Sequence, residues 1–97
     1  MVILKTLAPG RAMHGFEIAD AIYETSENVL QVEEGSLYPA LQRLLVKGWI
    51  SGEWGRTHGN RRARYYEITK AGHKQLVSEI EAYRRVFGAI SRILEPA

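Results

Sequence analysis

The sequence contains no cysteine, which excludes disulfide bonds, thiol chemistry and cysteine-bound zinc or iron–sulfur sites. Its three histidines are scattered along the chain and share no helical face, so the sequence predicts no metal site. A nucleophile–base pair, a phosphate-binding loop and a catalytic pair of carboxylates are missing as well. These absences predict a protein that is not an enzyme and that uses no cofactor.

Long hydrophobic runs are also missing. The apolar N-terminus, MVILKTLAPGRAM, is interrupted by Lys5, Pro9 and Gly10, and it is too short for a signal peptide or a membrane span. The chain has 97 residues, which suits one folded domain with a modest core. Together with the lack of cysteine, this composition predicts a cytoplasmic protein without a membrane partner.

The charge of the chain is small but uneven. The formal net charge is +2, yet residues 1–34 carry two basic side chains against six acidic ones. Residues 35–74 carry eight basic side chains against two acidic ones, and residues 75–97 are balanced. We therefore expect an acidic partner to bind the middle segment.

Apolar residues recur at helical spacing near the start of the chain. They predict a short helix over residues 2–8, which Pro9 and Gly10 break, and a second helix over residues 14–25. The VLQV sequence at residues 29–32 predicts a brief strand.

A third helix has marked ends. Ser36 is a good N-cap, and Pro39 would fall in the first turn, where a missing N–H costs little. Lys47 and Gly48 predict the end of the helix. Its apolar stripe, which predicts the buried side, consists of Leu37, Leu41, Leu44 and Leu45.

Two runs rich in aromatic and β-branched residues, 49–55 and 64–69, flank a turn signal at Gly59 and Asn60. This pattern predicts a β-hairpin. A charge run is often only a solvated loop, but this one lies within the basic segment of the chain. The charged residues expected at or near the hairpin tip are Arg56, His58, Arg61, Arg62 and Arg64.

The two tyrosines and the two tryptophans of the hairpin are expected to have different roles. Tyr65 and Tyr66 must point to opposite faces of a strand, so one is expected in the core and the other near a partner. Which of them is the anchor stays open. We interpret Trp49 and Trp54 as packing residues rather than as stacking platforms for bases.

Thr69 is the expected cap of a last helix, over about residues 70–94. Apolar residues repeat along this helix with the spacing of a coiled-coil seam, which predicts a two-fold homodimer. We therefore divide the chain into a domain of residues 1–69 and a dimerisation helix of residues 70–97. The seam consists of Leu76, Ile80, Tyr83, Phe87, Ile90 and Leu94.

Helices followed by a β-hairpin and one long helix make an α+β fold that is mainly α, in the order of a winged helix-turn-helix with a C-terminal dimerisation helix. In such a fold the third predicted helix would enter the DNA major groove by its N-terminal end. Its outward residues can bond phosphates or base edges. The expected DNA contacts are Ser36, Tyr38, Pro39, Gln42, Arg43 and Lys47 from the helix and Asn60, Arg61, Arg62 and Arg64 from the hairpin. His14 opens the second helix, so we interpret it as structural, with a phosphate contact as the minor alternative.

The motifs HGFEI, GSLYPALQRLLVKGWI and NRRARYYEITKAGHKQL occur in this order over nearly the whole chain. In this the sequence resembles the PadR family of bacterial transcriptional regulators, and GWISGEWG followed by NRRAR resembles its acidobacterial-type subgroup. The resemblance implies a dimeric repressor in which Ser36, Tyr38, Pro39 and the arginines of NRRAR contact double-stranded DNA at a pseudo-palindromic operator.

The sequence also departs from this family. Many members have a longer first helix, so this chain either begins within that helix or makes a small dimer contact there. Some members bind flat aromatic drugs between tryptophans of the dimerisation helix, but residues 70–94 contain no tryptophan. Drug binding therefore does not carry over, and any small-molecule effector stays unknown.

Two other classes of function compete with this interpretation. A winged-helix module could use the same surfaces to bind an acidic protein, although the Arg, Gln and Tyr side chains of the third helix favour DNA. An enzyme subunit is the more distant alternative, because a catalytic constellation is missing.

Overall fold

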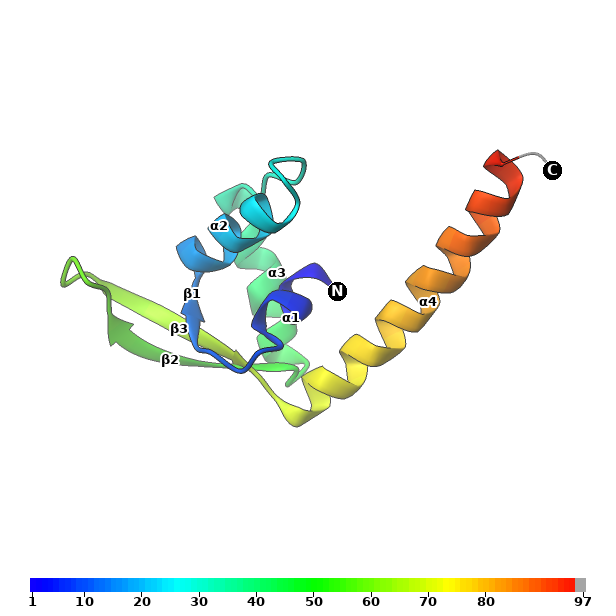
Figure 1. Ribbon diagram of the computed structural model, residues 1–97. Helices are drawn as coiled ribbons and strands as arrows, with labels where there is room; N and C mark the ends of the chain where they lie inside the picture. The colour runs from blue at the N-terminus through cyan, green and yellow to red at the C-terminus, as the bar shows by residue number, and fades with distance from the viewer. Residues whose placement is uncertain (96–97) are drawn as a thin grey trace.

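The computed structural model describes residues 1–95. Three short helices pack together over the base of a β-hairpin, and a fourth, long helix leaves the body on the side away from the hairpin tip (Figure 1). The α+β, mainly α class and the winged-helix arrangement are as predicted. The elements are α1 (Val2–Leu7), β1 (Met13–His14), α2 (Gly15–Thr25), α3 (Glu34–Val46), β2 (Ile50–Arg56), β3 (Arg62–Ile68) and α4 (Lys70–Leu94).

One hydrophobic core holds these elements together. The side chains of Leu4 and Leu7 from α1, Ile18 from α2 and Leu41 from α3 are fully buried. Each such side chain stabilises the fold by roughly 1.5–3 kcal/mol relative to leaving it in water. The core therefore fixes α2 and α3 against each other and on the base of the hairpin.

The sheet has three antiparallel strands in the order β1-β3-β2. The predicted hairpin is confirmed, but the strand expected at residues 29–32 is wrong. Val29 is 79% exposed there, and the backbone turns at Glu27 and Asn28, both of which have positive φ. The additional strand is instead β1, in which Met13 pairs with Tyr66.

The start of α3 differs from the prediction. The N-cap is Glu33, so Ser36 is the third helical residue and Pro39 lies in the second turn. Pro39 cannot donate to the carbonyl of Gly35, but Gly35 is exposed, so water can satisfy that carbonyl. The end of the helix is confirmed, since Lys47 is the C-cap and Gly48 has a φ of +74°.

The long helix α4 begins as predicted, with the Thr69 hydroxyl accepting a hydrogen bond from the Gly72 N–H at 3.0 Å. Leu76 is buried in the protein's own core, so its expected place in an intersubunit seam is wrong. Ile80 is half-buried against the same core. The first turns of α4 therefore belong to the body, and the rest of the helix projects from it (Figure 1). Within residues 1–95, no helix combines the length and the apolar character needed to cross a membrane.

Candidate nucleic-acid interface

The outer side of α3 is polar and open to solvent. Its buried side consists of Leu37 and Leu41, with Leu44 half-buried, as the leucine stripe predicts. The helix-borne candidates are all exposed, namely Ser36, Tyr38, Pro39, Gln42, Arg43 and Lys47. Apart from Val46 at its end, the helix therefore presents mainly hydroxyl, amide and basic groups.

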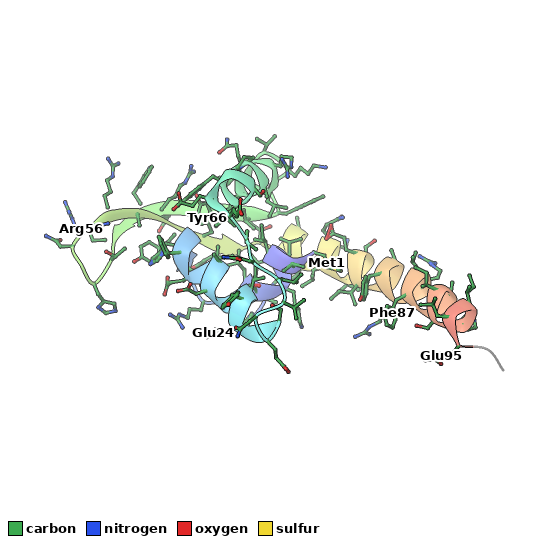
Figure 2. The ribbon with its side chains drawn as sticks, turned by 90° about the horizontal axis from the view of Figure 1, so that it is seen from above. Met1, Glu24, Arg56, Tyr66, Phe87 and Glu95 are labelled. Carbon is green, nitrogen blue, oxygen red and sulfur yellow. The ribbon has the colours of Figure 1, made fainter. Side chains whose placement is uncertain are left out.

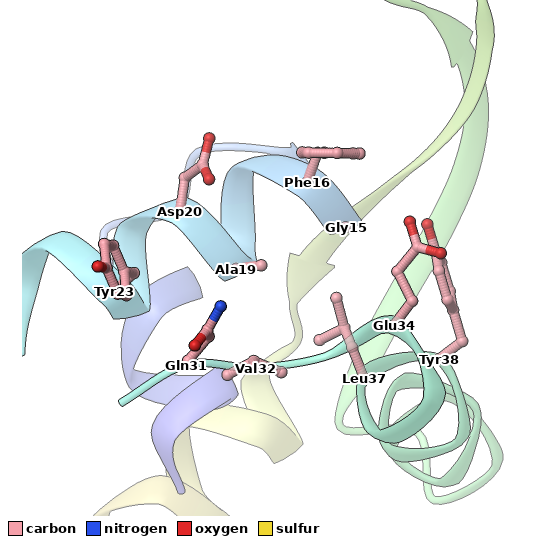
Figure 3. Close-up of a pocket in the computed structure, with 10 residues that line it drawn as sticks. All are labelled: Gly15, Phe16, Ala19, Asp20, Tyr23, Gln31, Val32, Glu34, Leu37 and Tyr38. Atoms are coloured by element: carbon pink, nitrogen blue, oxygen red, sulfur yellow. The ribbon is translucent and has the colours of Figure 1, made fainter. Parts of the chain in front are cut away.

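Tyr38 lies where α3 meets the start of α2. A Cβ added at Gly15 would lie 3.2 Å from the Tyr38 hydroxyl oxygen, so the glycine leaves room for the ring. Beside Tyr38 is a pocket of about 260 Å³, with α2 on one side and the start of α3 on the other (Figure 3). Asp20 and Glu34 line this pocket, so its carboxylates disfavour an anion.

On its other side, Tyr38 lines a second hollow, of about 310 Å³, between the body and the hairpin. We call this hollow the wing cleft. Its lining includes five of the predicted site residues, and it also includes Trp54, which was expected to be a packing residue. These six are His14, Tyr38, Trp54, Arg61, Arg62 and Arg64.

The positive charge of the wing cleft is not neutralised by a carboxylate of residues 1–95. Arg61, Arg62 and Arg64, like Arg56 beside them, have no carboxylate within 4.0 Å among residues 1–95. The two acidic residues of the hairpin, Glu53 and Glu67, lie on the opposite face of the strands, because side chains alternate along a strand. An anion entering the cleft therefore meets unpaired guanidinium groups.

Backbone and side-chain hydrogen bonds order the hairpin tip. Asn60 has a φ of 59°, a conformation that asparagine tolerates better than most residues, and its N–H donates to the Thr57 carbonyl at 2.9 Å. Arg56 Nη1 donates to the Asn60 carbonyl at 3.2 Å. Asn60 therefore shapes the turn, and it does not line the wing cleft.

Two other candidates lie apart from the cleft. Arg43 and Lys47 line a separate hollow together with Trp49 and Glu79. The Lys47 ammonium lies 4.8 Å from the centre of the Trp49 ring. These two side chains therefore form a second basic position on α3, away from the wing.

His14 has the structural role that the sequence predicts. It is the N-cap of α2, where its Nδ1 accepts from the Glu17 N–H at 3.4 Å and its own N–H donates to the Glu17 carboxylate at 3.1 Å. Its ring also meets the Tyr65 ring edge-on, with 5.4 Å between centroids. His14 thus fixes the start of α2 at the border of the cleft.

The open choice between the two tyrosines of β3 is decided by burial. Tyr66 is only 5% exposed and anchors the wing in the core. Tyr65 is half-buried on the other face, and its hydroxyl donates to the Arg56 carbonyl at 3.0 Å. The prediction that one tyrosine is a core residue is confirmed.

The tryptophans divide differently from the prediction. Trp49 packs against the core as expected, but Trp54 is 60% exposed, so its interpretation as a packing residue is wrong. Trp54 lies 4.4 Å from the Arg62 guanidinium carbon and 6.0 Å from that of Arg64, measured from the centre of its ring. The register of the hairpin pairs Trp54 with Arg64, and this register was not evident from the sequence.

Beyond Ile80, α4 leaves large apolar side chains in solvent. Tyr83 is 51% exposed and Phe87 57%, and their rings stack with 5.7 Å between centroids. Figure 2 shows Phe87 at the opposite end of the molecule from Arg56 of the wing. Ile90 and Leu94 continue this exposed apolar side of α4.

Comparison with known proteins places this arrangement in a family. The model of the transcriptional regulator PadR-like family matches residues 3–78. A transcriptional regulator from Clostridium thermocellum is 28% identical, with a TM-score of 0.86 over 97% of this chain and 90% of that one. A PadR family regulator from Clostridium difficile is 25% identical, with a TM-score of 0.80 over 97% of this chain and 95% of that one.

A third structure contains a ligand. PadR of Bacillus subtilis in complex with operator DNA has the same fold, with 22% identity and a TM-score of 0.72 over 81% of this chain and 44% of that one. The family match covers well over half of the chain, and it includes α3, the wing and the start of α4. The chain belongs to the PadR-like family of transcriptional regulators.

Proposed function

We propose that this chain is a sequence-specific DNA-binding repressor that acts as a homodimer on a pseudo-palindromic operator. The observation that carries the proposal is the wing cleft, where Tyr38 of α3 faces three arginines that lack carboxylate partners among residues 1–95. Unpaired guanidinium groups beside an exposed helix suit the phosphate backbone of a duplex. The complex of Bacillus subtilis PadR with operator DNA supports the same partner.

In the proposed complex, α3 enters the major groove by its N-terminal end. In this complex Ser36 and Tyr38 would bond phosphates near this end, and the amide of Gln42 would pair with an adenine edge. The wing arginines follow the flanking backbone or the minor groove, where arginine is favoured. Arg43 and Lys47 would reach DNA farther along α3 than the wing cleft.

We assign DNA binding and dimerisation to the two ends of the molecule. Residues 1–69 would bind DNA, and the helix from residue 70 would pair with its counterpart and set the separation of two half-sites. Residues 96–97, which belong to this predicted helix segment, lie outside the described residues. The likeness to the acidobacterial-type subgroup stays a prediction.

The proposal is tested by titrating DNA at several salt concentrations. A duplex selected by the protein from a random pool and a scrambled duplex of equal length serve as the two ligands. We expect the logarithm of the binding constant to fall linearly with the logarithm of salt concentration for both duplexes, because phosphate contacts release counterions. Binding that did not depend on salt, or that failed to distinguish the two duplexes, would contradict the proposal.

A further inference from the structure

Trp54 occupies an unusual position for a large apolar side chain. It lies on β2 near the tip of the hairpin, it is 60% exposed, and it lines the wing cleft. The hairpin tip extends beyond the helices, as Figure 1 shows, so the ring has no part in the core. Its surroundings are instead the arginines of β3.

The strand register places the ring and two guanidinium groups on one face. Trp54 is directly opposite Arg64, and Arg62 lies two residues from Arg64 along β3, so the three side chains point the same way. Both guanidinium carbons lie within 6.0 Å of the ring centre, with Arg62 at 4.4 Å. This is the range in which a cation is attracted to an aromatic face.

This attraction acts where the arginines would otherwise repel one another. Arg56 is directly opposite Arg62 on the same face, and like charges in such a pair are unfavourable. A carboxylate could hold these groups in place, but it would cancel the charge that binds phosphate. The indole ring can hold them without neutralising them.

A glycine completes the arrangement around Arg64. A Cβ added at Gly52 would lie 2.6 Å from Arg64 Nε, so the arginine side chain lies against the backbone of Gly52, where a larger side chain would displace it. Its Nε–H is buried and has no acceptor among residues 1–95, so no hydrogen bond from this group fixes the side chain. The bare backbone at Gly52 and the ring of Trp54 set its direction.

We propose that Trp54 is a positioning residue for DNA binding, whose indole face holds Arg62 and Arg64 directed into the wing cleft before DNA arrives. This inference rests on the proposed function, because it concerns how the wing meets phosphate. Side chains that are already ordered lose less conformational entropy on binding, which increases affinity without adding a contact.

The first test concerns the free protein and needs no DNA. In ¹H–¹⁵N spectra, the Nε–H signal of Arg62, identified by its disappearance in Arg62→Ala, should be displaced by the ring current of the indole. Trp54→Ala should return it to the position of a free arginine, and Trp54→Phe should retain part of the displacement. An unchanged Arg62 signal in Trp54→Ala would overturn the proposal.

The second test measures DNA affinity and its salt dependence. Trp54→Ala should weaken binding about 3- to 10-fold at every salt concentration, because the ring no longer attracts the two guanidinium groups. The slope against salt should stay that of the wild type, because the arginines that meet the phosphates are still present. Trp54→Phe should recover most of the affinity, whereas Trp54→Leu, which keeps bulk without an aromatic face, should not.

In the binding test, three outcomes would overturn the inference. Trp54→Ala could bind like the wild type, Trp54→Leu could bind as well as Trp54→Phe, or the salt slope could fall in Trp54→Ala as it should in Arg62→Ala. Ser51→Ala, on the opposite face of β2, is the matched control and should behave like the wild type. A wild-type protein that did not bind DNA would overturn the proposed function as well, so the two failures are distinguishable.

Discussion

Residues on one face of β3 lie in two different environments, the core and the wing cleft. Arg62, Arg64 and Tyr66 alternate along the strand and therefore share a face. Tyr66 lies under the helices and is buried, whereas the two arginines lie nearer the hairpin tip and line the wing cleft. The role of each residue thus depends on its distance from the base of the hairpin as well as on its face.

The proposed phosphate contact of the wing is tested by Arg62→Ala. Affinity for duplex DNA should fall for all sequences alike, and the salt slope should become shallower by about 0.9 for each phosphate that the variant no longer neutralises. Fluorescence anisotropy titrations at several salt concentrations measure both quantities. Arg92→Ala removes the same charge from an exposed position on α4 and is the control. A slope equal to that of the wild type in Arg62→Ala would contradict the assignment of the wing to phosphate.

The buried Tyr66 predicts a pH dependence of stability. Burial raises the pKa of its phenol above the ordinary value of about 10, against the opposing effect of the nearby Arg64 charge. The unfolded chain therefore releases this proton at lower pH than the folded protein, and it binds fewer protons between the two pKa values. Since stability falls with rising pH wherever the unfolded state binds fewer protons, the Tyr66 contribution is lost as pH rises above about 10.

Removing the phenolic hydroxyl should remove this contribution. Urea denaturation of Tyr66→Phe should show a smaller loss of unfolding free energy between about pH 8 and about pH 11 than the wild type shows. Tyr23→Phe removes a hydroxyl from an exposed ring and serves as the control. Equal losses in Tyr66→Phe and the wild type would show that the buried phenol does not determine this part of the pH profile.

At the scale of elements, the sequence predicts helix faces better than helix starts. Ser36 is a favourable N-cap, but the helix begins earlier, with the acidic Glu34 in its first turn, where the helix dipole favours negative charge. This error leaves the outward face unchanged, because the 3.6-residue period does not depend on where a helix begins. Tyr38 and Gln42 are therefore exposed as predicted.

Two features of the structure, the strand β1 and the exposure of Trp54, could not be predicted from the sequence. The two residues of β1 are too few to show alternation, so its pairing with β3 could not be predicted. Trp54 has the composition of a packing residue, and its exposure depends on how far the hairpin extends beyond the helices. Both features are set by tertiary arrangement, which local patterns do not contain.

The start of α4 packs so closely under the hairpin that one glycine is required. A Cβ added at Gly72 would overlap the carbonyl oxygen of Trp49 and lie 2.8 Å from Ile68 Cγ1. Gly72→Ala should therefore destabilise the fold by about 1–3 kcal/mol or more, despite the higher helix propensity of alanine. Urea denaturation at fixed protein concentration measures the change.

Gly88 of the same helix is the matched comparison. The nearest atom to its added Cβ is Arg92 Nη1 at 3.6 Å, which is an ordinary van der Waals distance. Gly88→Ala should leave stability unchanged or raise it by up to about 1 kcal/mol, because alanine loses less backbone entropy in a helix. A Gly72→Ala variant as stable as Gly88→Ala would contradict the close packing at the start of α4.

The whole molecule is elongated, with extents of 57 × 29 × 23 Å. The body buries α4 only as far as Ile80, and the projecting part keeps apolar side chains in water. A hollow of about 570 Å³ between α1, α2 and α4 adjoins this part and is lined by residues including Val2, Leu30 and Tyr83. A second copy that packs its own α4 against these surfaces would bury them, which is why we propose a dimer.

Phe87→Glu tests the proposed dimer at the centre of the exposed apolar side of α4. If the side chain is buried between two helices in the dimer, a carboxylate there would have to give up its hydration without a partner, which is costly. Light scattering should then give the mass of one 11.0 kDa chain at concentrations where the wild type gives twice that mass. Ala82→Glu introduces the same charge on another exposed side of α4 and should stay dimeric. A dimer of Phe87→Glu as tight as that of Ala82→Glu would exclude the seam, whereas a folded monomer would show that two copies pair through this side of α4.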